Sequence, residues 1–572
     1  MTGYKGIAAS PGIAIGRVQV YRAVEPEVVQ RTVPDSDAEA RRFLEAVQAA
    51  IGELEEIVAR LSVQGNCEQV QILEAHQMIL QDPEFAHSIE QNIRETSLNA
   101  EAALKTKTDE LVQMFEAMDN DYMRQRAADI RDISGRVLAK LYGVGYGVQI
   151  GDAQDVILVA EDLHPSDTIQ LDLTRVRGFV TDIGGRTSHT AIMARTRGIP
   201  AVVGTGSLSK NVHEQEIVIV DGETGDVFIN PSSEQLSLYE TKSRQFEQRQ
   251  TELLTLRDEK SETLDGHRIE LAANIGVPEE AVIGMEHGAE GVGLFRSEFL
   301  FMNRQDVPFE EEQFEAYRQA AVALKGRPLI IRTMDIGGDK SIDYMNLPHE
   351  LNPFLGYRAI RISLDRLELF RTQLRAILRA SHYGQVKVMY PMIATLDEVH
   401  LAKEVMESVK AELQAQEIPF NENIEQGIMV EIPAAAIAAD LIAPEVDFFS
   451  IGTNDLIQYT MACDRMNEKV SYLYQPYHPS VLRLVKMVID AAHQHGKWVG
   501  MCGEMAGDLA IVPVLIGLGI DELSMSPMSI LPVRKVVRSS ERKELEHLAI
   551  QAIALSTSNA VQELMKAYFD GK

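Results

Sequence analysis

Apolar residues recur at helical spacing in the first quarter of the chain. One such run advances in steps of three or four residues and comprises Phe43, Val47, Ile51, Leu54, Val58 and Leu61. This spacing puts the side chains on one face of a helix, whose start Asp35 or Ser36 can cap. Similar patterning continues to about Tyr142. We therefore predict an α-helical bundle over residues 21–145.

Short apolar runs separated by glycine-rich turns stand on both sides of the predicted bundle. Beyond residues 4–20, they are Val156–Val159, Val176–Thr181, Ala201–Val203, Ile217–Val220 and Asp226–Ile229. Their length and bounding turns indicate strands. We predict that residues 1–20 and 146–232 form one α/β domain, which the bundle interrupts. Residues 233–260 contain no glycine or proline and are predicted to be a helical linker.

Eight further apolar runs alternate with helical patterns between residues 261 and 572. The runs are Ile269–Asn274, Gly291–Phe295, Leu329–Thr333, Val386–Tyr390, Gly427–Glu431, Phe448–Ile451, Trp498–Cys502 and Glu522–Met525. Alternation of strand and helix, eight times over, is typical of a (β/α)8 TIM barrel, and the segment has a barrel's length. The predicted fold class is therefore multidomain α/β, with an α/β domain, an inserted helical bundle, a helical linker and a C-terminal barrel.

Composition and charge exclude several classes of protein. The 572 residues include 55 basic and 85 acidic side chains, a formal net charge of −30, without the basic footprint of a nucleic-acid-binding protein. Such a charge favours solubility or a basic macromolecular partner. Three cysteines cannot form a disulfide framework, and no signal segment or membrane-length apolar run is evident. We expect a cytoplasmic protein without membrane insertion.

A glycine-rich turn joins the predicted strand Val176–Thr181 to an apolar helix and carries a histidine. Ahead of His189, the turn contains Gly184, Gly185, Thr187 and Ser188. Either hydroxyl residue can cap the helix, and the free N–H groups at a helix start suit a phosphoryl group. His189 is therefore a candidate nucleophile, and Arg195 could neutralise the added charge. The alternative is an ordinary capped helix whose histidine makes one backbone hydrogen bond.

Charged and polar residues follow the predicted barrel strands, at the end where barrel enzymes carry their active sites. They are Arg296, Arg332, Lys340, Glu431, Asn454, Asp455, Arg465 and Cys502. The two carboxylates offer too few ligands for a full protein cage, which suits Mg²⁺ completed by substrate and water. The arginines can bind a carboxylate and a phosphate, with the lysine and asparagine as further phosphate contacts. The cysteine could act as an acid. Taken singly, each residue is more often a surface ion pair, a helix cap or a buried apolar group.

The segment Gly184–Ala194, GGRTSHTAIMA, resembles the phosphohistidine domain of enzymes that use phosphoenolpyruvate (PEP). In length and order of parts, the whole chain resembles the Enzyme I family of bacterial sugar phosphotransferase systems. The resemblance implies that His189 is phosphorylated on Nε2, that Glu431 and Asp455 bind the metal, and that Cys502 is the acid. It assigns substrate binding to Arg296, Arg332, Arg358, Asn454 and Arg465.

The same resemblance implies a reaction and its partners. PEP would phosphorylate His189 with Mg²⁺ and release pyruvate, and the phosphoryl group would pass to a histidine of the small carrier protein HPr. This is the first step of sugar uptake by such systems. The bundle would bind HPr, the barrel would form a homodimer, and the linker would allow the phosphohistidine domain to swivel between barrel and carrier.

Two other functions are alternatives to phosphoryl transfer from PEP to a carrier protein. PEP synthase and pyruvate phosphate dikinase share both motifs, but they need a large ATP-binding domain for which the chain offers no recognisable nucleotide loop. A silent scaffold that only docks proteins would be expected to lose His189 or the barrel residues, and all are present.

Overall fold

The computed structural model describes residues 2–21, 28–63, 73, 76–116, 121–144, 155–163, 175–185, 188–302, 304, 306–338, 342–465, 467 and 469–571. The chain divides into two compact units, Met1–Arg249 and Gln250–Lys572. Each is described by itself.

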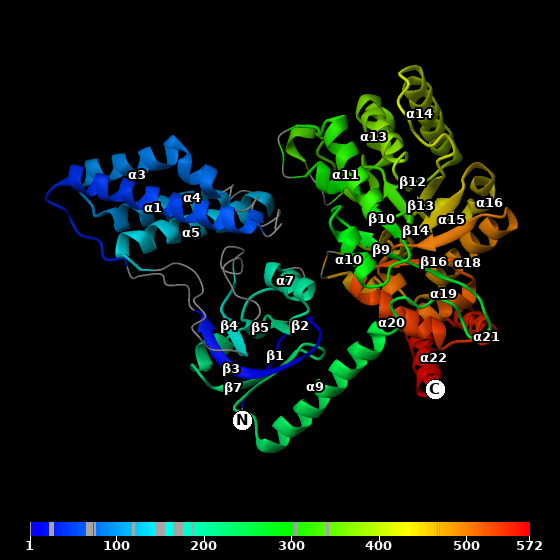
Figure 1. Cartoon of the computed structure of the whole chain (residues 1–572), viewed down its shortest axis with the longest axis horizontal. Helices are drawn as coiled ribbons and strands as arrows, with labels where there is room; N and C mark the ends of the chain where they lie inside the picture. The colour runs from blue at the N-terminus through cyan, green and yellow to red at the C-terminus, as the bar shows by residue number, and fades with distance from the viewer. Residues whose placement is uncertain are drawn as a thin grey trace. The chain divides into compact units, whose positions relative to one another are not determined.

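The first unit contains an eight-stranded mixed sheet (Figure 1). The strands are β1 Thr2–Lys5, β2 Ile7–Ser10, β3 Ile13–Tyr21, β4 Val156–Ala160, β5 Val176–Thr181, β6 Ala201–Val203, β7 Ile217–Asp221 and β8 Asp226–Ile229. Their order is β1-β8-β7-β3-β4-β5-β6-β2. Strands β3 to β6 are parallel, and the remaining pairs are antiparallel. The five strands predicted after residue 146 are thus confirmed.

Gly6 joins the two edges of this sheet. The strands β1 and β2 lie at opposite edges, yet this one residue separates them. Because successive Cα atoms are about 3.8 Å apart, the sheet must curl until its edges meet. At Gly6 a Cβ would lie 2.6 Å from the carbonyl oxygen of Val203 on β6, so the corner has room for glycine alone.

The described part of the inserted segment is mostly helical, as predicted; residues 22–27, 64–72, 74–75, 117–120 and 145 of the predicted bundle lie outside the described residues. Its long helices are α1 Ser36–Val63, α3 Pro83–Thr96, α4 Ala100–Glu116 and α5 Asp121–Tyr142. Asp35 is the cap, since its Oδ1 accepts a hydrogen bond from the Ala38 N–H at 2.9 Å. The apolar face predicted from the sequence, including Phe43, Val47 and Leu54, is buried in the core of the bundle.

After the sheet, helix α9 spans Ser233–Leu254 and is shorter than the helical pattern of the sequence. The reason lies in the buried guanidinium of Arg534, which donates to the carbonyls of Leu256 and Arg257 and also to that of Gly288. These carbonyls are therefore bound to the barrel and leave the helical hydrogen-bonding pattern.

The second unit is a closed barrel of eight parallel strands, which confirms the predicted TIM barrel (Figure 1). The strands are β9 Glu270–Ile275, β10 Val292–Arg296, β11 Pro328–Arg332, β12 Gln385–Tyr390, β13 Gln426–Val430, β14 Phe448–Ile451, β15 Trp498–Met501 and β16 Glu522–Met525. Each differs from its predicted bounds by at most one residue at either end.

Helices cover the outside of the barrel. They are α10 Glu280–Glu286, α11 Glu310–Ala323, α12 Ile360–Asp365, α13 Leu367–Ala380, α14 Leu396–Ala415, α15 Pro433–Ile437, α16 Ala439–Ile442, α17 Thr453–Met461, α18 Pro479–Gln494, α19 Val512–Leu518, α20 Pro527–Arg538, α21 Arg542–Ala554 and α22 Ser558–Asp570. Apolar side chains on the outward face of the strands pack against these helices in one large core.

The inward face of the strands holds a smaller apolar cluster. Leu294, Ile330, Met389 and Met429 fill the middle of the barrel. Near its N-terminal end, the ring of Trp498 stacks on Phe448 with centroids 4.6 Å apart. Inward-pointing residues at the C-terminal strand ends are then free to be polar, because the core below them is already filled.

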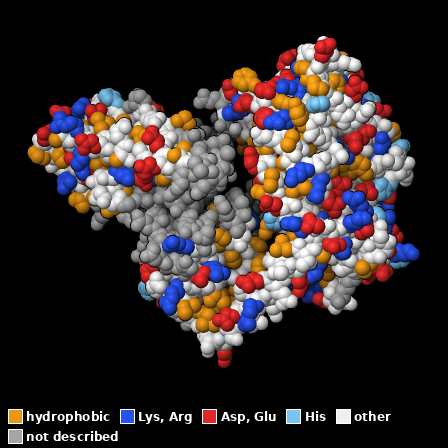
Figure 2. Space-filling view, in the orientation of Figure 1, with side chains coloured by type: hydrophobic (Ala, Val, Ile, Leu, Met, Phe, Trp, Pro, Cys, Tyr) orange, Lys and Arg blue, Asp and Glu red, His pale blue; other side chains and the backbone are white. Residues whose placement is uncertain are grey.

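Among the described residues, no helix is both long enough and apolar enough to cross a membrane. The surface of the barrel unit shown in Figure 2 carries acidic and basic side chains interspersed. The net charge of −30 is thus not gathered in one acidic patch on this face of the barrel.

Candidate active site

The predicted nucleophile motif lies where strand β5 leads into helix α7, His189–Arg197. Ser188 is the N-cap, and its hydroxyl accepts a hydrogen bond from the Ala191 N–H at 3.4 Å. Gly184 has φ +114°, a conformation that favours glycine. Gly185 has open space beside it and accepts a hydrogen bond from the Ser188 N–H. His189 is therefore the first residue of a capped helix, where N–H groups without helical partners meet the positive end of the dipole.

Some of the predicted residues lie outside what the structure describes. These are Thr187, Lys340 and the side chain of His189. Arg195 is described, and its Nη1 donates to the carbonyl of Ala9 on β2 at 3.1 Å. That bond ties α7 to the edge of the sheet.

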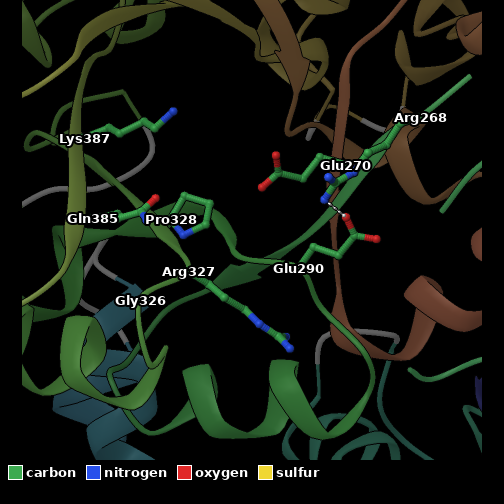
Figure 3. A pocket seen from close by; sticks show the side chains of 8 residues that line it. All are labelled: Arg268, Glu270, Glu290, Gly326, Arg327, Pro328, Gln385 and Lys387. Atoms are coloured by element: carbon green, nitrogen blue, oxygen red, sulfur yellow. Dashed lines mark hydrogen bonds and ion pairs between the residues drawn. The ribbon is translucent and has the colours of Figure 1, made fainter. Parts of the chain in front are cut away.

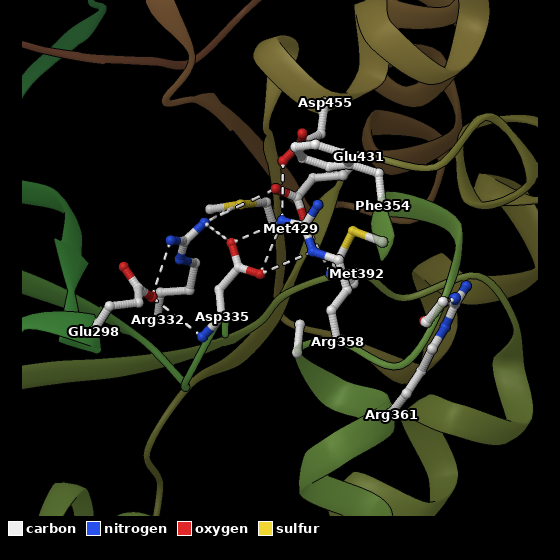
Figure 4. A network of polar contacts seen from close by, with 12 residues as sticks. Glu298, Arg332, Asp335, Phe354, Arg358, Arg361, Met392, Met429, Glu431 and Asp455 are labelled. Atoms are coloured by element: carbon white, nitrogen blue, oxygen red, sulfur yellow. Dashed lines mark hydrogen bonds and ion pairs between the residues drawn. The ribbon is translucent and has the colours of Figure 1, made fainter. Parts of the chain in front are cut away.

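The structure brings the predicted barrel residues to the C-terminal ends of neighbouring strands. Arg296 and Arg332 end β10 and β11, and Glu431 and Cys502 directly follow β13 and β15. Asn454 and Asp455 lie in the first turn of α17, after β14. Two further side chains, Glu298 and Asp335, for which no role was predicted, bind several of these residues (Figure 4).

Arg332 is enclosed by three carboxylates. Its Nη2 lies 3.0 Å from Oε1 of Glu298, and its Nη1 lies 2.9 Å from Oδ2 of Asp335 and 3.9 Å from Oε1 of Glu431. All four side chains are buried. Burial alone would lower the pKa of Arg332, but Glu298, Asp335 and Glu431 raise it above its ordinary value. The guanidinium is therefore a permanent, fixed positive charge.

A second arginine, Arg358, binds the other carboxylate oxygen of Asp335. Its Nη2 lies 3.0 Å from Oδ1 of Asp335 and 3.4 Å from Oδ2 of Asp455. The hydroxyl of Tyr459 accepts a hydrogen bond from Nη1 at 3.3 Å and donates to the carbonyl of Phe354. The ring of Phe354 also stands 5.5 Å from the guanidinium carbon. Arg358 is thus held in one orientation, and Asp335 connects it to Arg332 (Figure 4).

Three buried carboxylates converge in the middle of this network. Oxygens of Asp335, Glu431 and Asp455 lie within 4.8 Å of one another. Burial and the neighbouring charges of Asp455 and Asp335 raise the pKa of Glu431 to about 8. Among the described residues, Oδ1 of Asp455 has no hydrogen-bond partner. Hard carboxylate oxygens at this spacing, one of them unpartnered, could hold a divalent cation.

The remaining polar residues border this cluster. Arg296 lies at the end of β10, and its pKa is lowered by desolvation of the guanidinium and by the charge of Arg332. Asn454 accepts a hydrogen bond from the Glu504 N–H at 3.0 Å. The backbone N–H of Arg465 donates to Oε1 of Gln458 at 3.1 Å. Two neighbouring guanidinium groups such as Arg296 and Arg332 could bind an anion.

Cys502 is buried just below the cluster, with only 3% of its surface exposed. Its backbone N–H donates to the carbonyl of Ile451 at 3.1 Å. Burial raises the pKa of the thiol to about 11, although the Ser450 hydroxyl and the arginines act in the opposite direction. At neutral pH the group is therefore a protonated thiol, which can donate a proton.

A separate pocket of about 450 Å³ opens at the N-terminal ends of the strands (Figure 3). Glu270, Glu290, Arg268, Arg327 and Lys387 are among its lining residues. It lies at the end of the barrel opposite to the arginine and carboxylate cluster, so we assign it no part in the candidate site.

Asp335 and Glu298 were not predicted as parts of the site. Both follow barrel strands, as the predicted residues do, and that position is the signal by which the sequence could have indicated them. The contact of Arg358 with Asp335 could not be found from spacing, because the two residues are 23 positions apart within an irregular connection.

Three family descriptions match the chain. Residues 5–126 match "PEP-utilising enzyme, N-terminal", residues 152–225 match "PEP-utilising enzyme, mobile domain", and residues 250–542 match "PEP-utilising enzyme, PEP-binding domain". The matches cover both units.

Curated proteins named phosphoenolpyruvate-protein phosphotransferase match nearly the full length. Identity is 51% over 566 residues with the protein of Staphylococcus carnosus, covering 99% of this chain and 98% of the relative. It is 52% over 566 residues for Listeria monocytogenes and 50% over 567 residues for Bacillus subtilis, covering 99% of each chain in both comparisons. A solution structure of Enzyme I is 36% identical and covers 43% of this chain and 99% of its own, with a TM-score of 0.38.

Proposed function

Because this chain belongs to the PEP-utilising enzymes, and among them to the phosphoenolpyruvate-protein phosphotransferases, we infer that it transfers the phosphoryl group of PEP to itself and then to a carrier protein. We propose that His189 accepts the group and that HPr receives it, in the first step of sugar uptake. The observation that carries this proposal is the cluster of fixed arginines and carboxylates at the strand ends of the barrel.

We propose that the arginines bind the two anionic ends of PEP. Arg296 and Arg332 are adjacent positive charges, and Arg358 and Arg465 extend the set. Asn454 and Lys340 add phosphate contacts in this proposal. A guanidinium held by carboxylates keeps its orientation before substrate arrives, which lowers the entropic cost of positioning the phosphoryl group.

The residues of the cluster fit a divalent cation, which we propose to be Mg²⁺. Glu431 and Asp455 would hold it, and Asp335 lies within reach as a third carboxylate. The unpartnered Oδ1 of Asp455 supports this proposal, since a buried carboxylate oxygen without a partner is costly. When bound, the cation would neutralise negative charge on the phosphoryl group and on the enolate.

In the proposed reaction, the Nε2 atom of His189 attacks phosphorus while the bond from phosphorus to the enol oxygen breaks. The electron pair of that bond forms the enolate of pyruvate. Cys502 then gives its proton to the methylene carbon, and pyruvate leaves. The resulting thiolate regains a proton from solvent. The N–P bond of phospho-His189 breaks in the second step, when a histidine of the carrier attacks.

We further propose a function for each segment of the chain. Residues 1–20 and 146–232 form the phosphohistidine domain, 21–145 the bundle that binds HPr, 233–260 the linker, and 261–572 the PEP-binding barrel through which a homodimer forms. A location in the cytoplasm stays a prediction.

The proposal is tested by labelling the protein with ³²P-PEP and Mg²⁺. The wild type should acquire an acid-labile, alkali-stable label, as phosphohistidine does, and His189→Ala should acquire none. His213→Ala, an exposed histidine of the same domain, serves as the matched control and should label fully. Equal labelling of wild type and His189→Ala would refute the nucleophile. No label on either protein would favour the silent scaffold.

A further inference from the structure

The carbonyl of the candidate acid Cys502 is bound by a side chain that is distant in sequence and comes from the next strand but one in the barrel. The Nδ2 atom of Asn274, on β9, donates to the Cys502 carbonyl oxygen at 2.9 Å. Strand β16 lies between β9 and β15 in the barrel, so this bond passes across the neighbouring strand on the inside of the barrel. The strand ladder therefore does not supply the contact, and a polar side chain does.

The amide of Asn274 is itself oriented. Ser524, on the intervening strand β16, donates its hydroxyl proton to Oδ1 of Asn274 at 2.7 Å. Ser524 is fully buried, and Asn274 is half-buried. The Cys502 carbonyl can only accept a hydrogen bond, so the amide must present its NH₂ group to it. The amide oxygen then accepts from Ser524, and this second bond holds the amide in that orientation.

Close packing next to Cys502 leaves the backbone little freedom. The N–H of Cys502 donates to the Ile451 carbonyl, and its carbonyl accepts from Asn274. At the next residue, Gly503, a Cβ would lie 1.8 Å from Oγ1 of Thr453. The backbone is consequently held on both sides of the cysteine, and the thiol itself donates to the Ile451 carbonyl at 3.8 Å. An acid that protonates one face of an enolate needs such a fixed direction.

From this geometry we infer that Asn274 is a positioning residue for proton transfer, acting through the carbonyl of Cys502 and oriented by Ser524. This inference rests on the proposed role of Cys502. It concerns the protonation of the methylene carbon and not the transfer of the phosphoryl group, so the two steps should separate in a variant.

The test follows the stereochemistry of protonation in the full-length enzyme. The substrate is PEP with one deuterium at a defined position on its methylene carbon, in tritiated water, and the product is pyruvate with a chiral methyl group. In the wild type, pyruvate of one methyl configuration should dominate. In Asn274→Leu and Asn274→Asp, which lack the amide donor, the excess should fall towards zero, while ³²P label stays near one per chain.

Three further variants complete the experiment. Ser524→Ala should lose part of the excess, and it also serves if the Asn274 variants do not fold. Asn423→Leu, an exposed asparagine of the same unit, is the matched control and should behave as wild type. Cys502→Ala should abolish the excess.

The outcomes distinguish the positioning role of Asn274 from the proposed role of Cys502 as the acid. Wild-type chirality in the Asn274 variants together with loss in Cys502→Ala would overturn the inference alone. Wild-type chirality in Cys502→Ala would overturn the role of the cysteine, and the inference with it. Loss of phosphoryl label in the Asn274 variants at saturating PEP would also contradict the inference, because positioning of the acid leaves that step intact.

Discussion

Asp335 and Arg358 form a buried ion pair, with Oδ1 of Asp335 3.0 Å from Nη2 of Arg358. The other carboxylate oxygen of Asp335 lies 2.9 Å from Nη1 of Arg332. One carboxylate therefore fixes two of the arginines that we propose to bind PEP, and the site is largely ordered before substrate binds.

Asp335→Asn should weaken both arginine contacts while preserving size. A hydrogen bond from a displaced arginine to a charged substrate group is worth about 1.5–3 kcal/mol, so kcat/KM for phosphoenzyme formation should fall by roughly 10- to 100-fold. Asp440→Asn, on the exposed side of α16, is the matched control and should retain wild-type kinetics. A kcat/KM within about twofold of wild type in Asp335→Asn would show that the arginines hold their positions without it.

Removal of divalent cations by EDTA should abolish ³²P labelling, and Mg²⁺ should restore it. Glu431→Gln and Asp455→Asn should each raise the Mg²⁺ concentration that gives half-maximal rate by about tenfold or more, because each removes one carboxylate ligand. Titration of the labelling rate with Mg²⁺ measures this directly. Undiminished labelling in EDTA would contradict the metal site.

The thiol of Cys502 should react slowly with iodoacetamide at pH 8. Its pKa is raised to about 11 by burial, so the reactive thiolate is scarce, and the side chain is only 3% exposed. Peptide mapping of the alkylated protein gives the rate, with a small thiol in solution as reference. For the same reason, activity should not fall between pH 7 and 9 through ionisation of this thiol. Fast alkylation of Cys502 would place the pKa near the ordinary value.

Glu522, buried at the N-terminal end of the barrel, should make the barrel less stable as pH rises. Burial and the neighbouring Glu270 raise the pKa of Glu522 to about 8 in the folded state. Between about pH 4.5 and 8, the folded protein therefore binds a proton that the unfolded chain has released. The free energy of unfolding should fall across this range, by at most about 1.4 kcal/mol per pH unit.

Glu522→Gln should reduce this fall and be more stable than wild type at pH 8.5. The chain has a single tryptophan, Trp498 on β15, so its fluorescence reports urea unfolding of the barrel alone. Glu563→Gln, exposed on α22, is the control. An unchanged pH profile in Glu522→Gln would assign the dependence to other groups.

Gly503→Ala should disrupt the loop that follows Cys502. The added Cβ would lie 1.8 Å from Oγ1 and 2.6 Å from the backbone nitrogen of Thr453. Since backbone cannot move aside cheaply, the substitution should displace the cysteine segment and cost at least about 1–3 kcal/mol. Gly496→Ala, after α18, has no atom within 4 Å and tests the effect of glycine replacement itself, although its φ of +68° carries some strain. Equal stability of Gly503→Ala and wild type would mean that the loop has alternative packing.

Much of the fold follows from hydrophobic periodicity. The barrel strands were predicted because buried parallel strands are short apolar runs bounded by turns, and Phe448–Ile451 and Glu522–Met525 were predicted to the residue. The predicted helix over residues 233–260 extends beyond the end of α9, because the sequence after Leu254 contains no glycine or proline that would end a helix. The residue that ends it, Arg534, is remote in sequence, and its contact with Leu256 and Arg257 exists only after folding.

The candidate site was predictable where chemistry coincides with a strand end. Arg332, Glu431 and Cys502 were found in this way and by the family resemblance. Asn274 was not, although it too lies near a strand end, because its role depends on a hydrogen bond across the barrel to a backbone carbonyl. A sequence does not indicate which backbone carbonyl accepts a side-chain hydrogen bond, since every residue has a carbonyl.

The corner at Gly6 has a consequence for how the first unit is made. The chain's first two strands are synthesised before any other, yet β1 pairs with β8 and β2 with β6, both of which emerge only after the bundle. On the ribosome, these two strands must wait while most of the unit is translated, and the sheet cannot close until its last strands appear. The helices that the structure describes in the bundle end at Tyr142, so the bundle can fold first, and translation should yield a folded insert before the domain that surrounds it.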